Sequence, residues 1–202
     1  MARRPRETPA EGRARRAAVE DPAVVLEAAA RFLEVRPRSV AEVRRRLGEA
    51  GYRPDLVEGA IERLLALGYL DDAAFARAWV ESRDRARPRG ARSLRDELRH
   101  KGVAAEATEA ALAAREEAAT GAEVAGETPS PPVGERAATA AGDRDAAARL
   151  LARRGGPLLR EPDPRRRRAR AYALLARSGF DPEVCREAVL DWAGAAGSDG
   201  EA

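Results

Sequence analysis

Residues 67–83 read LGYLDDAAFARAWVESR, and they predict the end of one helix, a tight corner and the start of another. Gly68 supplies the left-handed backbone that closes a helix. Asp71 or Asp72 then offers a carboxylate to the free N–H groups of the next helix, whose dipole also favours negative charge at that end. An apolar stripe follows at helical spacing and indicates the buried face of that helix: Phe75, Trp79 and Val80.

The same helix-closing pattern recurs along the chain. A leucine lies four residues before a glycine, and an apolar residue follows the glycine, at three further places: Gly51, Gly102 and Gly179. Ten residues after these glycines the chain again places apolar residues: Ile61, Leu112 and Val189. A pattern that returns at fixed offsets predicts three related units of three helices each.

The composition favours an all-α protein. Charged residues make up 35% of the 202 residues and aromatic residues 4%, while small apolar residues recur at helical spacing. A single three-helix unit buries little surface, so tandem units are expected to share interfaces. We therefore expect three tandem three-helix repeats that form an elongated, curved rod.

Changes in composition place the boundaries of these units. Runs rich in Arg, Pro, Ala or Gly without apolar periodicity separate or flank the helical parts. The expected order is a disordered basic tail over 1–22, repeat 1 over 23–70, repeat 2 over 71–115, a flexible insertion over 116–142, repeat 3 over 143–193 and a disordered tail over 194–202.

Several classes of function are disfavoured by what the sequence contains. His100 is the only histidine and Cys185 the only cysteine, so a Cys–His pair or a zinc cluster has little to draw on. Cys185 lies at the offset of two small residues of the other repeats and is expected to be buried. We expect no enzyme activity, no cofactor and no metal. One cysteine and no long apolar run favour a cytoplasmic protein, which we expect to be a monomer.

A basic surface is the remaining candidate for function. The middle helix of each repeat is rich in arginine, and such a surface suits phosphates or an acidic protein. The candidate residues for a partner or DNA are Arg83, Arg89, Arg92, Arg99, Lys101, Arg165, Arg166, Arg167 and Arg168. The alternative is that these side chains pair with local Asp and Glu and only solubilise the helices. Trp79 is expected to belong to the core rather than to anchor a partner.

The corner and the segment after it resemble the RecX family of recombination regulators. The resemblance is carried by Gly68-Tyr69-Leu70-Asp71-Asp72, Phe75-Ala76, Trp79-Val80 and Arg83, and then by Arg89-Gly90, Leu94, Glu97-Leu98 and Lys101-Gly102. It covers residues 24–115 well and residues 143–193 more loosely. The N-terminal arginine tail and the insertion depart from the short members of the family.

The resemblance implies a bacterial cytoplasmic protein of tandem three-helix repeats. It also implies binding to the RecA recombinase filament on single-stranded DNA, with inhibition of ATP hydrolysis and strand exchange, and for some members contact with DNA. Two other hypotheses stay open at this point. The chain could be an autonomous DNA-binding helical repeat, whose affinity would depend steeply on salt, or a scaffold for another protein.

Overall fold

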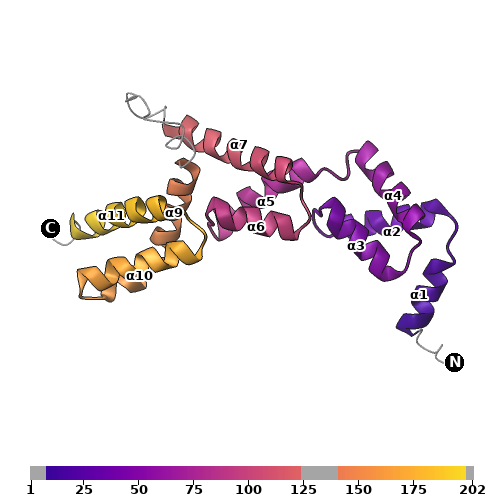
Figure 1. Cartoon of the computed structure of the whole chain (residues 1–202), viewed down its shortest axis with the longest axis horizontal. Coiled ribbons are helices and arrows are strands. Elements are labelled where there is room, and N and C mark those ends of the chain that lie inside the picture. The colour runs from indigo at the N-terminus through magenta and orange to yellow at the C-terminus, as the bar shows by residue number, and fades with distance from the viewer. Residues whose placement is uncertain (1–7, 124–140, 199–202) are drawn as a thin grey trace. The chain divides into compact units, whose positions relative to one another are not determined.

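The computed structural model describes residues 8–123 and 141–198, and every regular element in these ranges is a helix (Figure 1). The predicted all-α repeat fold is confirmed. The chain forms two compact units. Unit 1 takes in the described residues up to Phe75 together with His100–Ala104, and unit 2 takes in Ala76–Arg99 and the described residues from Ala105 onward.

Unit 1 contains the first three-helix repeat. Its helices are α2 (Pro22–Glu34), α3 (Val40–Ala50) and α4 (Pro54–Ala66), and α2 packs on both α3 and α4. The shared core is apolar, and its buried members recur at helical spacing: Val25, Ala29, Val43, Leu47, Val57, Ala60, Ile61, Leu64 and Leu70. Burial of these side chains is the main stabilising contribution in the unit.

A helix precedes this repeat where a disordered tail was expected. Pro9–Ala17 form α1, which contacts α3. Thr8 and Glu11 make a capping box, in which each residue bonds the other's backbone N–H. The prediction for residues 1–22 is therefore wrong over α1, because the Thr-Pro-Ala-Glu capping signal starts a helix in a segment without apolar periodicity.

Repeat 2 is built from α5 (Asp72–Ala86), α6 (Ala91–His100) and α7 (Ala105–Glu123). Repeat 3 is built from α9 (Ala141–Arg154), the short 3-10 helix η1 (Gly156–Arg160), α10 (Pro164–Arg177) and α11 (Pro182–Ser198). In unit 2, α7 packs on α9, and α11 packs on α9 and α10.

Two further boundary predictions need correction. The expected flexible insertion at 116–142 begins as helix, since α7 continues to Glu123 and α9 starts at Ala141. The remainder of that prediction lies outside the described residues. The expected disordered tail at 194–202 is helical as far as Ser198. Both stretches contain alanines, which have the highest helix propensity, so they form helix although they lack apolar periodicity.

The four glycines that the sequence singles out have left-handed backbone. Their φ angles are positive: 98° at Gly51, 73° at Gly68, 73° at Gly102 and 82° at Gly179. The residues at matching offsets in the three repeats are buried alike, including Ile61, Leu112 and Val189 at 2%, 5% and 5% exposure. Gly51, Gly102 and Gly179 thus end the middle helices in equivalent surroundings, as a repeat requires.

The middle helices begin in two ways. Val40 and Ala91, the first residues of α3 and α6, lie eleven residues before their glycines, and α10 begins fifteen residues before Gly179. The extra turn of α10 starts with its own N-cap, because the Asp163 carboxylate accepts a bond from the Arg165 N–H at 2.8 Å.

Candidate partner-binding surface

The two acids of the corner cap different helices. Asp71 accepts a hydrogen bond from the Ala74 N–H at 2.9 Å and therefore caps α5, as the sequence predicts for one of the pair. Asp72 instead accepts a hydrogen bond at 2.9 Å from the N–H of Val40, the first residue of α3. Both acids thus stabilise helix starts, and sequence spacing could not show the second partner because it lies 32 residues away.

Trp79 and Arg83 meet a glutamate that the sequence analysis did not treat as a site residue. Trp79 Nε1 donates to Glu97 Oε2 at 2.8 Å, and Arg83 Nε donates to the same oxygen at 2.6 Å. The Arg83 guanidinium also lies 4.4 Å from the centre of the Trp79 ring. Arg89 approaches the other Glu97 oxygen at 3.9 Å. This cluster ties α5 to α6, so Arg83 and Arg89 have structural partners.

Lys101 is held inside unit 1. Its ammonium group donates to Glu42 at 3.1 Å, and the Lys101 side chain is only 17% exposed. Glu42 also bonds the Ser39 N–H and Arg36. Burial acts to raise the pKa of Glu42, but the hydrogen bonds from Lys101, Ser39 and Arg36 together hold that pKa below its ordinary value.

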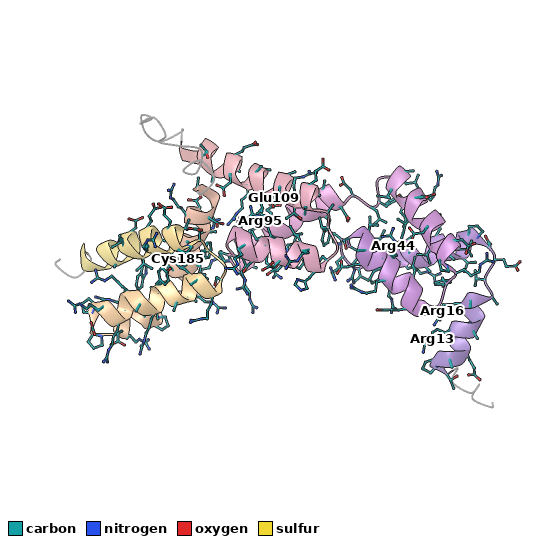
Figure 2. The ribbon with its side chains drawn as sticks, in the orientation of Figure 1. Arg13, Arg16, Arg44, Arg95, Glu109 and Cys185 are labelled. Carbon is teal, nitrogen blue, oxygen red and sulfur yellow. The ribbon has the colours of Figure 1, made fainter. Side chains whose placement is uncertain are left out.

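An Arg–Glu pair joins the second and third helices in two of the repeats. Arg44 Nε and Nη2 donate to Glu58 at 2.6 and 2.7 Å, and Arg95 donates in the same forked way to Glu109 at 2.7 and 2.9 Å. Figure 2 labels Arg44 on α3 and shows Arg95 beside Glu109 in the second repeat. The hydrogen bond from the paired arginine lowers the pKa of each glutamate.

The remaining candidate arginines lie on the surface of unit 2. Arg92, Arg165, Arg166 and Arg168 are exposed, and Arg167 is half-buried. Surface ion pairs engage two of the candidates: Arg99 with Asp96 at 2.8 Å and Arg166 with Asp163 at 3.6 Å. Within the described ranges no ion pair is found for Arg92, Arg165 or Arg168.

The structure separates these exposed arginines into two groups. The start of α6 lies at the end of α10, because the Gly90 N–H donates to the Ser178 carbonyl at 3.1 Å. Arg165–Arg168 lie at the other end of α10, and the helix rises roughly 15 Å between Arg168 and Ser178. Arg92 and the arginine run therefore do not form one compact site.

A buried charged cluster inside unit 2 was missed by the sequence analysis. Arg115 donates to Asp84 at 2.8 and 3.1 Å and to Asp143 at 2.6 Å, and its side chain is 6% exposed. Asp143 also accepts the Ala91 N–H at 3.0 Å. Burial raises the pKa of Asp84 in spite of Arg115. No local spacing relates these residues, so the sequence carried no signal for them.

The single thiol is unsuited to catalysis. Cys185 is fully buried in the repeat 3 core, and burial raises the pKa of its thiol to about 11. A thiol with that pKa is almost wholly protonated at neutral pH and is a poor nucleophile. In the described residues, no group of three or more His, Cys, Asp and Glu side chains could hold a metal ion. None of the helices within residues 8–123 and 141–198 combines the length and apolar character needed to span a membrane.

Comparison with known proteins adds independent information on this architecture. Residues 26–64 match the family model of the first three-helix domain of RecX, and residues 71–112 match that of the second. A regulatory protein RecX of Mycobacteroides abscessus is 46% identical over 83 residues, which are 41% of each chain. One of Prosthecochloris aestuarii is 42% identical over 81 residues, which are 40% of this chain and 54% of the relative.

Two solved structures share the fold. A crystal structure of regulatory protein RecX has a TM-score of 0.62 at 20% identity and covers 84% of this chain and 71% of the other. The crystal structure of RecX from Lactobacillus salivarius also has a TM-score of 0.62, at 17% identity, and covers 86% and 97%. The curated relatives are matched over only about half of their length, whereas the structural likeness takes in most of this chain.

Proposed function

Since its two matched domains place this chain in the RecX family, we propose that it binds the RecA recombinase filament on single-stranded DNA and lowers the filament's ATPase and strand-exchange activity. The observation that supports the proposal most is the match of both domain models in tandem, over residues 26–64 and 71–112. The relatives are named as regulatory proteins, and the role needs no chemistry from this chain.

Inhibition would follow from differential binding. A protein that binds one state of the filament more tightly shifts the filament toward that state. The surface of α10 supports this role because Arg165 and Arg168 are exposed cations without an ion pair in the described residues. Arg92 on α6 offers a second contact of the same kind.

The site proposed for the filament is therefore narrower than the sequence suggests. Arg83 and Lys101 already bond glutamates of this protein and Arg89 lies 3.9 Å from one, so we assign all three to the support of the fold. Arg92, Arg99 and the run Arg165–Arg168 remain the proposed contacts. Arginine suits them because its planar fork pairs with carboxylate or phosphate oxygens.

The decisive experiment measures RecA ATPase on single-stranded DNA with increasing amounts of the chain below one equivalent. We expect inhibition by the wild type and a loss of inhibition of about tenfold or more in the double variant Arg165→Glu, Arg168→Glu, since two charge reversals each cost on the order of 1 kcal/mol. Arg53→Glu in unit 1 serves as the control. If the wild type leaves the ATPase unchanged at every ratio, the proposal fails.

The alternative of autonomous DNA binding is tested with the same proteins. Titration of labelled single-stranded DNA without RecA, at several salt concentrations, gives the affinity and the salt slope. Tight binding at physiological salt that disappears in the Arg165→Glu, Arg168→Glu variant, with no effect on RecA, would favour the DNA-binding alternative over the regulatory role.

A further inference from the structure

Three of the left-handed glycines, Gly51, Gly102 and Gly179, follow a carbonyl that accepts a hydrogen bond from outside its own helix. Ser39 Oγ donates to the Lys101 carbonyl at 2.6 Å, ahead of Gly102. The Gly90 N–H donates to the Ser178 carbonyl at 3.1 Å, ahead of Gly179. We call the carbonyl and the glycine after it a corner site.

In both of these corner sites the donor belongs to the start of a middle helix. Ser39 is the N-cap of α3, and Gly90 directly precedes α6. In both, the incoming helix start also comes so close that the glycine is required. A Cβ at Gly102 would lie 2.3 Å from the Ala41 Cβ, and a Cβ at Gly179 would lie 2.7 Å from the Ser93 Cβ. A corner site thus receives the beginning of the middle helix of the preceding repeat.

Within the described residues only α1 precedes the first repeat, and the corner site of that repeat is nevertheless filled. Arg16 Nε of α1 donates to the Ala50 carbonyl at 2.5 Å, ahead of Gly51. A Cβ at Gly51 would lie 2.9 Å from Arg13 Cγ and 3.1 Å from the Arg13 carbonyl oxygen. Figure 2 shows both arginines on α1. The same acceptor and the same close approach are therefore used a third time, by a different element.

Gly68 shows that these contacts are not a general property of left-handed glycines. Its φ is also positive, but apart from Gly68 itself and its chain neighbours no atom lies within 4 Å of the position of an added Cβ. Gly68 follows the third helix of its repeat, whereas the three filled corners follow middle helices. Filling is thus specific to the end of the middle helix.

From these contacts we propose that α1 is an N-terminal capping helix, which occupies the corner site of repeat 1 in place of the middle-helix start of a preceding repeat. A terminal repeat of such an array needs a polar cap on the surface that would otherwise pair with a neighbour. α1 meets this need with arginines rather than with apolar side chains, and its nine residues are too few for a stable helix without docking. The helix and the corner site therefore depend on each other.

The dependence is measured by hydrogen exchange on the full chain. In Gly51→Ala the added methyl meets Arg13 and the left-handed backbone is strained, so we expect α1 to leave the corner. The Gly12 amide, which bonds the Thr8 carbonyl inside α1, should then exchange about tenfold faster or more, as expected when the docking that holds a short helix is lost. Gly68→Ala carries the same backbone strain with no neighbour in the way, and should leave the Gly12 amide unchanged.

A second variant tests the same dependence without strain at the glycine. Arg16→Ala removes the donor to the Ala50 carbonyl and should accelerate exchange at the Gly12 amide and at the corner amides of Gly51 and Tyr52. Arg45→Ala on the surface of α3 removes one arginine as a charge-matched control. The equivalent amides of Gly179 and Phe180 should stay unchanged in every variant.

Two results would overturn the proposal. One is unchanged exchange of the α1 amides in both Gly51→Ala and Arg16→Ala, because α1 would then be stable without the corner. The other is equal acceleration in Gly51→Ala and Gly68→Ala, which would mean that backbone strain in the repeat, and not docking, controls α1.

Discussion

Asp72 in unit 1 and Asp143 in unit 2 perform the same task in different surroundings. Each comes from the first helix of a repeat and accepts the N–H of the first residue of the preceding middle helix, Val40 at 2.9 Å and Ala91 at 3.0 Å. Asp72 is half-buried, whereas Asp143 is 6% exposed and also bonds Arg115 at 2.6 Å. The comparison teaches that the same capping contact can be an isolated hydrogen bond or part of a buried charge network.

The two sites should therefore differ in energy. A capping carboxylate at a half-exposed helix start contributes about 1 kcal/mol, and salt screens part of it. A buried carboxylate that pairs with a buried guanidinium is costly to leave alone, because neither charge can return to water. Three predictions test this difference and a fourth compares the pH dependence of the two units; they run from the largest expected effect to the smallest.

Arg115→Met should have the largest effect. It removes the buried cation that Asp84 and Asp143 share and leaves Asp84 only the longer contact with Arg149 at 3.7 Å, so the free energy of unfolding of unit 2 should fall by about 3–5 kcal/mol. Urea unfolding followed by tryptophan fluorescence reports on this unit, since Trp79 and Trp192 both belong to it. Arg99→Met, whose pair with Asp96 is exposed, should cost less than about 1 kcal/mol. Equal losses in the two variants would show that Arg115 contributes no more than a surface pair.

Asp143→Ala should come next. It removes the acceptor of the Ala91 N–H and one partner of Arg115, and we expect a loss of about 2–3 kcal/mol by the same urea measurement. Asp143→Asn keeps an acceptor oxygen but loses the charge, so its cost measures the contribution of the ion pair. A cost for Asp143→Asn close to zero would assign the stabilisation to the cap alone.

Asp72→Ala should cost about 1 kcal/mol, the usual contribution of an N-cap. Hydrogen exchange at the first amides of α3 measures the loss locally in unit 1. Asp72→Asn should be nearly neutral, because the amide oxygen can accept the Val40 N–H. If Asp72→Ala destabilises unit 1 as much as Asp143→Ala destabilises unit 2, burial does not distinguish the two caps.

The smallest predicted effect is a difference in pH dependence between the units. Burial raises the pKa of Asp84, so the folded state holds that proton more tightly, and its contribution to stability decreases as the pH rises from about 3.9 through the raised pKa. The pKa of Glu42 is lowered, so its contribution is present above about 4.3 and is lost as the pH falls through the lowered pKa.

The measurement is the slope of unfolding free energy against pH, obtained by hydrogen exchange for each unit. Asp84→Asn should make the slope of unit 2 more positive, and Glu42→Gln should make the slope of unit 1 less positive. The slopes are compared rather than the stabilities, because either substitution can weaken the fold at all pH values. A slope of unit 2 that Asp84→Asn leaves unchanged would contradict the assignment to Asp84.

The sequence allowed the helices and glycine corners to be predicted, since both depend on residues close together in the chain. Gly51, Gly102 and Gly179 end helices at the expected places because left-handed backbone is nearly exclusive to glycine. The capping role of one corner acid follows from a spacing of three residues, Asp71 to Ala74. An elongated, curved rod stays a prediction.

The candidate site was predicted less well because the charge of a side chain does not show which other charged side chain it pairs with. Lys101 and Glu42 are 59 residues apart, and Arg115 and Asp143 are 28 apart, so no local pattern joins them. Arg83 lies in an arginine-rich stretch, yet its side chain donates a hydrogen bond to Glu97, which also accepts one from Trp79. Such pairings are set by tertiary packing, which the spacing of residues in one helix does not encode.

The longer start of α10 has a consequence for how many repeats such a chain can contain. The first N–H groups of α3 and α6 both bond a carboxylate of the repeat that follows. The start of α10 is instead capped by Asp163, the residue just before it, and needs no carboxylate from another repeat. Where the earlier repeats present Ser39 and Gly90 to the next corner, the same offset in the last repeat holds Arg167. A repeat placed directly after α10 would therefore find neither a helix start that lacks a cap nor a small residue at the corner offset, whereas a repeat placed after α3 or α6 would find both.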